Sequence, residues 1–394
     1  MKSFQTIYYD TKKRLQLAMD VHDNNGGTHP HHESLLQVVS VMSVSPLKVT
    51  EPRLALQVVA DGVMERRSIG GCYQIVLYYN HCTDEDSGWN LAGWIVESLA
   101  KALVDYPLLA GRLQRRQDDH NTCLQQIVCN DSGIRLLEAR CRLTLPRFLD
   151  ELDRNKNHEE QLVFWNEIDH QNPEFSPLVY VQVTNFKCGG YSIGISCSLL
   201  LAEVLVVDNF LKKWAKIHNE MLLKNGEIKR PIFYQPCQRK FDEALPSYVI
   251  SRTLFKTGAE SMVFKITSKE ASFNTERLRE IAMICVKEVE QKFNTKMGSK
   301  FSFVVKESSN VTRVQSPSKS NGKQSSMQGL ALKNNIQMTP TTWNEFGLYE
   351  VAFSKGNTAV HVACWVASVP DGHVLAVPYP KENASAVIIV SPPC

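Results

Sequence analysis

The chain has 394 residues, of which 43% are apolar and 22% are charged, with a formal charge of +3. This length is enough for two domains with a sizeable core, and the composition is that of a soluble globular protein. The near balance of 44 Lys and Arg against 41 Asp and Glu excludes the strongly basic character of nucleic-acid-binding proteins, so we expect no nucleic acid partner.

The cysteines and the apolar runs indicate a cellular compartment. Eleven cysteines are scattered without a zinc-like spacing, which favours free thiols in a reducing compartment and no metal site. The N-terminal MKSFQTIYYD lacks the apolar region of a secretory signal, and the longest apolar run, 193–207, is too short to span a bilayer. We therefore expect a cytoplasmic monomer without a transmembrane segment.

Residues 1–34 predict a loose extension. They contain three histidines that could bind a metal, His29, His31 and His32, but no carboxylate or cysteine lies at ligand spacing. A flexible, solvated tail is the favoured interpretation.

From residue 35 the pattern alternates between strand and helix. The runs 35–44 and 71–80 predict strands. A helix follows, with Asn90 as its N-cap and apolar residues at three- and four-residue spacing up to Leu103. Pro107 is expected to end this helix, and Gly111 permits a turn.

The middle of the chain predicts a hairpin followed by a helix. Two β-rich runs, 178–186 and 191–198, flank a Cys-Gly-Gly turn. From Leu199 onward the apolar residues take a helical spacing that continues to Trp214. Residues 226–254 are polar and irregular, and we interpret them as a crossover.

The second half predicts a second, smaller domain. Its pattern indicates a strand at 262–267, a helix at about 275–293, a strand at 301–305, a low-complexity loop at 316–326 and a turn at 370–372. The predicted organisation is an extension (1–34), an N-terminal domain (35–225), the crossover (226–254) and a shortened C-terminal domain (255–394).

Three stretches resemble BAHD acyltransferases, which move an acyl group from coenzyme A to an alcohol or amine. YPLLAGRL (106–113) resembles the family's YPLAGRL, residues 175–215 resemble the stretch around its catalytic HxxxD, and NEFGLYEVAF (344–353) lies where the family has DFGWG before a strand. The resemblance implies an α/β fold of two chloramphenicol-acetyltransferase-like domains with a channel between them.

A narrower resemblance points to the Eceriferum/Glossy branch of that family. It is carried by CNDSGIRLLEA (129–139) and FSPLVYVQVTNFKCGG (175–190). That branch is associated with cuticular wax and very-long-chain fatty acid elongation. The resemblance implies the condensing enzyme of the elongase as a partner, acyl-CoA as a substrate or ligand, no bound cofactor, and a peripheral place on the cytosolic face of the endoplasmic reticulum.

The catalytic motif of this family is degenerate here. Its histidine deprotonates the acceptor and its aspartate holds the loop by an ion pair; these positions are Leu199 and Glu203. Leucine has no lone pair, and a positioned general base contributes about 10²–10⁴-fold to a rate. We therefore predict a protein without HxxxD catalysis, in which Glu203 keeps a structural ion pair.

Two other interpretations stay open. One is an active acyl-CoA-dependent acyltransferase with a non-standard base, for which Cys197 is a weak candidate, because a nucleophilic cysteine needs a lowered pKa and a small buried apolar role is simpler. The other is a degenerate relative without a role beyond folding.

The remaining polar candidates are assigned structural or surface roles. His361 and His373 have no evident acidic partner, so we interpret them as structural. The positions laid on DFGWG, also given a structural role, are Glu345, Phe346, Gly347, Leu348 and Tyr349. We expect His81 and Asp84 to lie on a surface loop, Lys212 and Lys213 on a solvated helix face, and Ser316 to be at most a phosphorylation site.

Overall fold

The computed structural model describes residues 35–60, 70–80, 88–117, 123–206, 209–224, 261–268, 273–299, 301–316, 336–367, 369–379 and 385–393. The predicted extension 1–34 and crossover 226–254 lie outside these residues, as do His81, Asp84 and most of the predicted loop 316–326.

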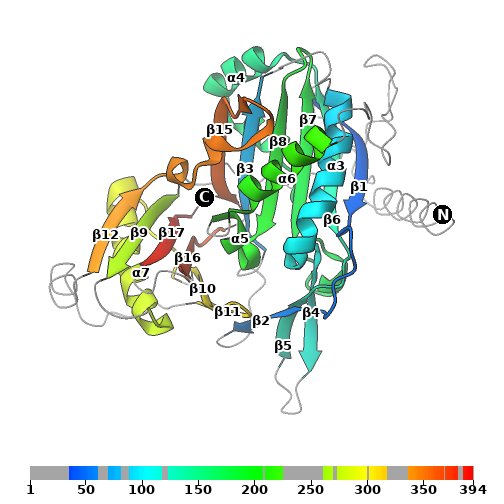
Figure 1. Cartoon of the computed structure of the whole chain (residues 1–394). Helices are drawn as coiled ribbons and strands as arrows, with labels where there is room; N and C mark the ends of the chain where they lie inside the picture. The colour runs from blue at the N-terminus through cyan, green and yellow to red at the C-terminus, as the bar shows by residue number, and fades with distance from the viewer. Residues whose placement is uncertain are drawn as a thin grey trace, which may run out of the picture. The chain divides into compact units, whose positions relative to one another are not determined.

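The first sheet has six strands in the order β1-β6-β7-β8-β3-β15. β6 and β7 are parallel, and the other neighbours are antiparallel. Helices α3 (Gly88–Asp105) and α6 (Phe210–Lys224) lie over one face of this sheet (Figure 1). Helix α4 (Leu145–Arg154) packs on the other face. The strands are β1 (Leu36–Val44), β3 (Cys72–Tyr79), β6 (Ile134–Cys141), β7 (Val179–Phe186), β8 (Tyr191–Ser198) and β15 (His361–Ala367).

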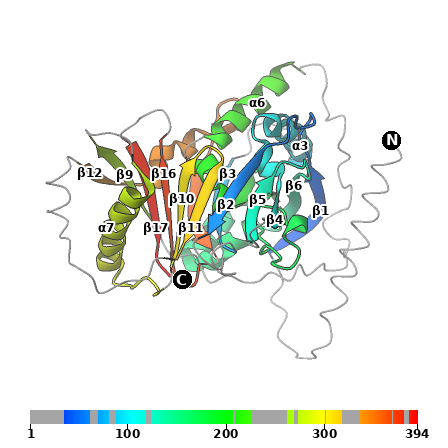
Figure 2. The same ribbon diagram turned by 90° about the horizontal axis from the view of Figure 1, so that it is seen from below.

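The second sheet has nine strands in the order β12-β9-β17-β16-β10-β11-β2-β5-β4. Helix α7 (Thr275–Phe293) packs along β17 and its neighbours (Figure 2). Asn274 caps this helix by accepting a hydrogen bond from the backbone N–H of Arg277 at 2.8 Å. The strands are β2 (Ala55–Ala60), β4 (Arg112–Gln117), β5 (Cys123–Val128), β9 (Met262–Ser268), β10 (Ser302–Ser308), β11 (Val311–Gln315), β12 (Ile336–Thr341), β16 (His373–Pro378) and β17 (Ser385–Ser391).

Burial explains why the strands of the first sheet read as continuous apolar runs. On β3, Tyr73, Ile75 and Leu77 belong to the core under α3 and α6, whereas Val76 and Tyr78 belong to the core under α4. A strand covered on both faces needs apolar residues at every position, because successive side chains point to opposite faces.

The two halves of the chain exchange strands. β15, from the second half, pairs with β3 in the first sheet, and β2 from the first half pairs with β11 in the second sheet. Contacts group residues 36–394 into one compact unit. β3 is apolar on both faces and would otherwise end the sheet with an unpaired edge, which β15 covers. The predicted boundary between 225 and 255 therefore separates two halves of the sequence, but each sheet contains strands from both halves.

Most of the predicted elements are confirmed, and two details are wrong. Helix α7 and the strands at 35–44, 71–80, 178–186 and 191–198 lie where the sequence placed them. However, α3 begins at Gly88, so Asn90 is inside the helix and is not its N-cap. The helix expected from Leu199 is broken into η5 (Leu199–Leu201), α5 (Glu203–Val206) and α6, and Asn209 before α6 has a left-handed φ of 53°.

The fold is thus mixed α/β with two large sheets. The turn predicted at 370–372 is confirmed, since Gly372 has a φ of 88° and its N–H donates to the carbonyl of Val369 at 3.0 Å. None of the helices in the described ranges combines the length and the apolar character that a membrane crossing requires.

Candidate active-site region

Leu199 lies directly after β8, where the chain turns into η5. The hydroxyl oxygen of Ser198 accepts a hydrogen bond from the backbone N–H of Leu200 at 3.4 Å and so caps the turn. The backbone N–H of Leu199 donates to the carbonyl of Gly71 at 3.3 Å. Its side chain is 1% exposed, and a Cβ placed on Gly71 would lie 2.7 Å from Leu199 Cδ1. Leu199, which the resemblance predicts to stand at the position of the family's base, is therefore buried against the start of β3.

Glu203 forms an ion pair that joins α5 to the second sheet. Its Oε1 contacts the Nζ of Lys306, which lies on β10. The Glu203 side chain is 14% exposed and that of Lys306 is 10% exposed. The prediction that Glu203 makes an ion pair is confirmed, and its partner lies on β10 of the second sheet. A carboxylate held in this way positions the segment after Leu199 and is not a free base.

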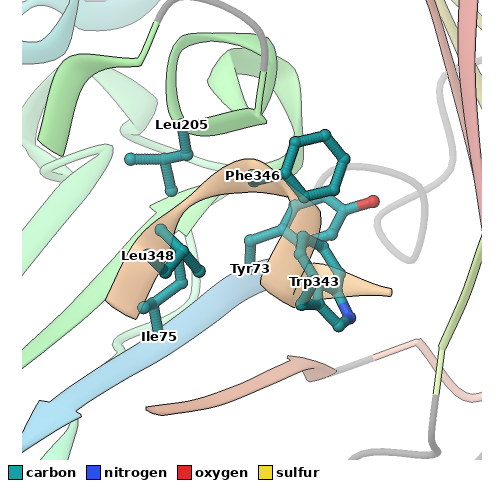
Figure 3. A pocket seen from close by; sticks show the side chains of 6 residues that line it. All are labelled: Tyr73, Ile75, Leu205, Trp343, Phe346 and Leu348. Carbon is teal, nitrogen blue, oxygen red and sulfur yellow. The ribbon is translucent and has the colours of Figure 1, made fainter. Parts of the chain in front are cut away.

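A small apolar pocket lies beside this segment. Its volume of about 10 Å³ holds roughly one water molecule. The Trp343 ring lies 5.9 Å from the ring of Tyr73 and 5.8 Å from that of Phe346. At this point the described side chains therefore close the space in which a channel is expected. The lining residues are Tyr73, Ile75, Leu205, Trp343, Phe346 and Leu348 (Figure 3).

Cys197 has the environment of a structural thiol. It is fully buried, and burial raises its pKa well above that of a free cysteine, with the charge of Glu203 adding to the effect. Within the described residues, the Sγ of Cys197 donates a weak hydrogen bond to the carbonyl of Ser198 at 3.6 Å. A nucleophilic cysteine needs a stabilised thiolate, which this environment disfavours. The geometry favours the apolar role for Cys197.

We expect Cys197 to be unreactive in the folded protein. Cys188, in the turn between β7 and β8, is exposed and serves as the internal comparison. A maleimide should label Cys188 within minutes under native conditions and Cys197 only after denaturant is added, as read by peptide mass spectrometry. Labelling of the two thiols at similar native rates would contradict this assignment.

The positions laid on DFGWG form two short turns rather than a motif directly before a strand. Glu345 and Phe346 end η6 (Trp343–Phe346), Gly347 has a φ of 66°, and Leu348 and Tyr349 begin η7 (Leu348–Glu350). This places Leu348 in the core and leaves Tyr349 exposed.

Lys212 lies at the partly exposed surface of α6 and also contacts this loop. Its Nζ lies 2.8 Å from Oε2 of Glu350. This hydrogen bond and the lysine charge hold the pKa of Glu350 below its usual range. A Cβ on Gly347 would lie 2.1 Å from the same Nζ, so the glycine makes room for the lysine. Lys213 remains exposed, with its Nζ 5.1 Å from the centre of the Tyr106 ring.

The DFGWG pattern fits equally well seven residues later, at 352–356. There Phe353 and Gly356 match, as many residues as in the first register. Phe353 is fully buried, with its ring 4.8 Å from that of Trp214, and Gly356 has a φ of 78° in the turn between β13 (Ala352–Ser354) and β14 (Asn357–Thr358).

The two histidines of the second half differ in their surroundings. His361 Nε2 lies 3.8 Å from Oε1 of Glu159, and Tyr78 donates its hydroxyl to the same oxygen at 2.7 Å. The expectation that His361 lacks an acidic partner is therefore wrong, because Glu159 reaches it from a distant segment. His373 is fully buried, and burial lowers its pKa to about 3, so its ring is neutral.

Comparisons with known proteins bear on the family of the chain. Residues 72–316 match the sequence profile described as "Transferase family". The chain is 34% identical to the protein ECERIFERUM 2 of Arabidopsis thaliana over 119 residues, which are 29% of this chain and 28% of that protein. It is 38% identical to ECERIFERUM 26 of the same plant over 108 residues, 27% of this chain and 23% of that protein.

These alignments span less than a third of the length of either relative. The crystal structure of vinorine synthase matches 91% of this chain and 94% of its own, at 16% identity and a TM-score of 0.43. The profile covers more than half of the chain. The chain belongs to this transferase family, the BAHD acyltransferases, and has ECERIFERUM proteins among its relatives.

Proposed function

We propose that this chain is a BAHD-fold protein that works without HxxxD catalysis. It acts in very-long-chain fatty acid elongation and cuticular wax formation as a partner of the elongase condensing enzyme. The observation that carries the proposal is Leu199, a buried leucine at the position of the family's base. The likeness to ECERIFERUM proteins supports the choice of pathway.

The neighbouring groups also favour a role without acyl transfer. Glu203 is bound to Lys306, and Cys197 is buried with a raised pKa, so neither replaces the missing imidazole. A protein that acts by binding another protein needs a stable surface but does not need a general base. In this proposal the chain is cytoplasmic and reaches the cytosolic face of the endoplasmic reticulum through a membrane-bound partner, with acyl-CoA as a ligand.

The direct test is co-expression in yeast with a plant elongase condensing enzyme. Acyl chain lengths are measured by gas chromatography with each protein alone and with both together. Longer chains only when both are present support the partner function. Unchanged chain lengths, together with release of coenzyme A by the purified protein in the presence of an alcohol acceptor, support a working acyltransferase instead.

Substitution of Leu199 separates packing from chemistry in the same assay. Leu199→Met nearly conserves volume and should cost less than about 1.5 kcal/mol, so we expect wild-type elongation. Leu199→Ala should cost about 2–5 kcal/mol through the cavity it leaves, and elongation should follow protein abundance measured on the same cells. Loss of elongation in Leu199→Met at normal abundance would contradict a role without chemistry at this position.

A further inference from the structure

Two arginines of the first half of the chain lie near each other without an acidic partner. Arg112 begins β4 and is 4% exposed, and Arg135 lies near the start of β6 and is half-buried. Burial lowers the pKa of Arg112 to about 10, and the positive charge of Arg135 adds to the effect. Within the described ranges, neither guanidinium forms an ion pair with a carboxylate. Neighbouring cations taken out of water are costly unless an anion pairs with them.

Arg112 is held in a fixed orientation by backbone carbonyls. Its Nη1 donates to the carbonyl of Gly111 at 2.8 Å and to that of Gly133 at 2.9 Å. Its Nη2 donates to the carbonyl of Ser132 at 3.3 Å. These bonds fasten the guanidinium to the turn that precedes β6, two residues before Arg135. The N–H of Nε and the second N–H of Nη2 remain for a ligand.

Arg135 belongs to a row of side chains across the first sheet. It is paired with Ser43 of β1 on one side and with Tyr180 of β7 on the other. Residues that pair directly across neighbouring strands point to the same face. The Nη1 of Arg135 donates to the hydroxyl oxygen of Ser43 at 2.7 Å. Ser43 is exposed, so the row opens to solvent at this end.

Tyr180 closes the inner end of the row with an uncharged hydroxyl. Burial raises its pKa to about 12 against the opposing charges of both arginines, so the phenol is neutral and is not their counter-charge. The rings of Phe164 and Trp165 lie 5.2 Å and 5.6 Å from its ring. Tyr180 packs in the core under α4, whereas the pocket beside Leu199 belongs to the core under α3 and α6. The arginines therefore lie away from that pocket, toward the other face of the sheet.

The carboxylates of the adjoining segments are engaged elsewhere. Asp131 accepts hydrogen bonds from the backbone N–H and the hydroxyl of Thr50, at 2.9 Å and 2.6 Å. Asp169 accepts from two residues that follow it in its own turn. Glu138 is three positions from Arg135 on β6, and an odd spacing places it on the opposite face.

The number of charges selects the class of anion. A guanidinium can bind a carboxylate or a phosphate through two parallel hydrogen bonds. The two arginines carry two positive charges, and a phosphate monoester carries about −1.5 to −2 at pH 7, whereas a carboxylate balances only one of them. The Ser43 hydroxyl accepts from Arg135 and still has its own O–H to donate.

We propose that Arg112 and Arg135 bind a phosphate dianion, either free or as the head of a small phosphomonoester. The hydroxyls of Ser43 and Tyr180 serve as further donors, and the anion enters from the exposed Ser43 end of the row. The site does not depend on Leu199 or on a condensing-enzyme partner.

The test is calorimetric titration of the full chain with inorganic phosphate at about pH 7.5 and constant ionic strength. We expect saturable binding of one phosphate, with a roughly millimolar dissociation constant. Acetate, which carries one charge, should bind at least about tenfold more weakly. Glycerol 3-phosphate distinguishes the sources, since tighter binding than phosphate indicates a phosphomonoester and equal binding indicates free phosphate. No saturable binding of phosphate, or equal binding of acetate, would overturn the proposal.

A pair of variants assigns the site. Arg135→Met should weaken phosphate binding by at least about tenfold, because it removes a charged donor from the anion. Arg147→Met is the matched control, since it removes the same charge from an exposed position on α4 and should leave the dissociation constant unchanged. Equal weakening in both variants would show general attraction by the charge of the protein and would contradict a specific site. Arg112 is not substituted, because its loss leaves three carbonyls without their donor.

The melting temperature separates binding from a structural role of Arg135. Without phosphate, Arg135→Met should melt at or above the temperature of the wild type, because the repulsion between the two arginines is removed. Added phosphate should raise the melting temperature of the wild type and leave that of Arg135→Met unchanged. A phosphate response of the same size in both proteins would overturn the assignment, whatever their melting temperatures without phosphate.

Discussion

Lys306→Met is expected to lower the free energy of unfolding by about 3–5 kcal/mol. The substitution removes the charge of Lys306 from beside the Glu203 carboxylate, which is 14% exposed, and breaking a buried ion pair on one side typically has a cost of this size. Urea unfolding followed by circular dichroism measures the change. Because the pair joins α5 to β10, the loss should also loosen the segment around Leu199.

Two controls isolate the buried pair. The double variant Lys306→Met with Glu203→Leu should recover most of the stability, since an apolar pair of similar volume replaces both charges. Lys212→Met breaks the exposed pair with Glu350, whose side chains are 38% and 75% exposed, and should cost less than about 1 kcal/mol. Equal losses for Lys306→Met and Lys212→Met would show that burial does not set the strength of the Glu203 pair.

Gly194→Ala is expected to prevent stable folding. A Cβ at this position of β8 would lie 1.9 Å from the carbonyl oxygen of Leu162 and 2.9 Å from its carbon. These are backbone atoms, so relief requires η3 (Lys156–Leu162) to move away from the sheet, at a cost of about 4 kcal/mol or more. Soluble yield and thermal unfolding measure the effect.

Ser192→Ala on the same strand is the matched control. The Ser192 hydroxyl is buried and has no hydrogen-bond partner among the described residues, so its removal should leave stability unchanged or slightly raised. A Gly194→Ala protein that melts within a few degrees of the Ser192→Ala protein would show that η3 can be displaced cheaply. The predicted result would show that glycine is required at position 194 because the backbone of Leu162 approaches it closely.

Local structure could be predicted from the sequence because its causes are local. The hairpin of β7 and β8 follows from two apolar runs around Gly189, which has a φ of 85°. Helix α7 follows from its apolar spacing and its cap, Asn274. The leucine at 199 is visible in the sequence itself, and its assignment to the position of the family's base stays a prediction.

The partners of the site could not be predicted because they come from distant segments. Nothing in the sequence around Glu203 identifies Lys306, and nothing around His361 identifies Glu159. The ring contact between Tyr73 and His373 likewise joins β3 to β16, which are far apart in the sequence. The broken helix after Leu199 was missed because its apolar spacing continues across Asn209, where the backbone turns left-handed.

The pairing of β15 with β3 has a consequence for the synthesis of the protein. β3 ends at Tyr79, whereas β15 begins at His361, so the ribosome must add almost the whole intervening chain before this edge can be covered. At about 5–20 residues per second, the delay is roughly 15 to 60 s. During that time the nascent chain presents an apolar strand edge that can pair with other chains. We expect its yield to depend on co-translational chaperones more than on the stability of the finished fold.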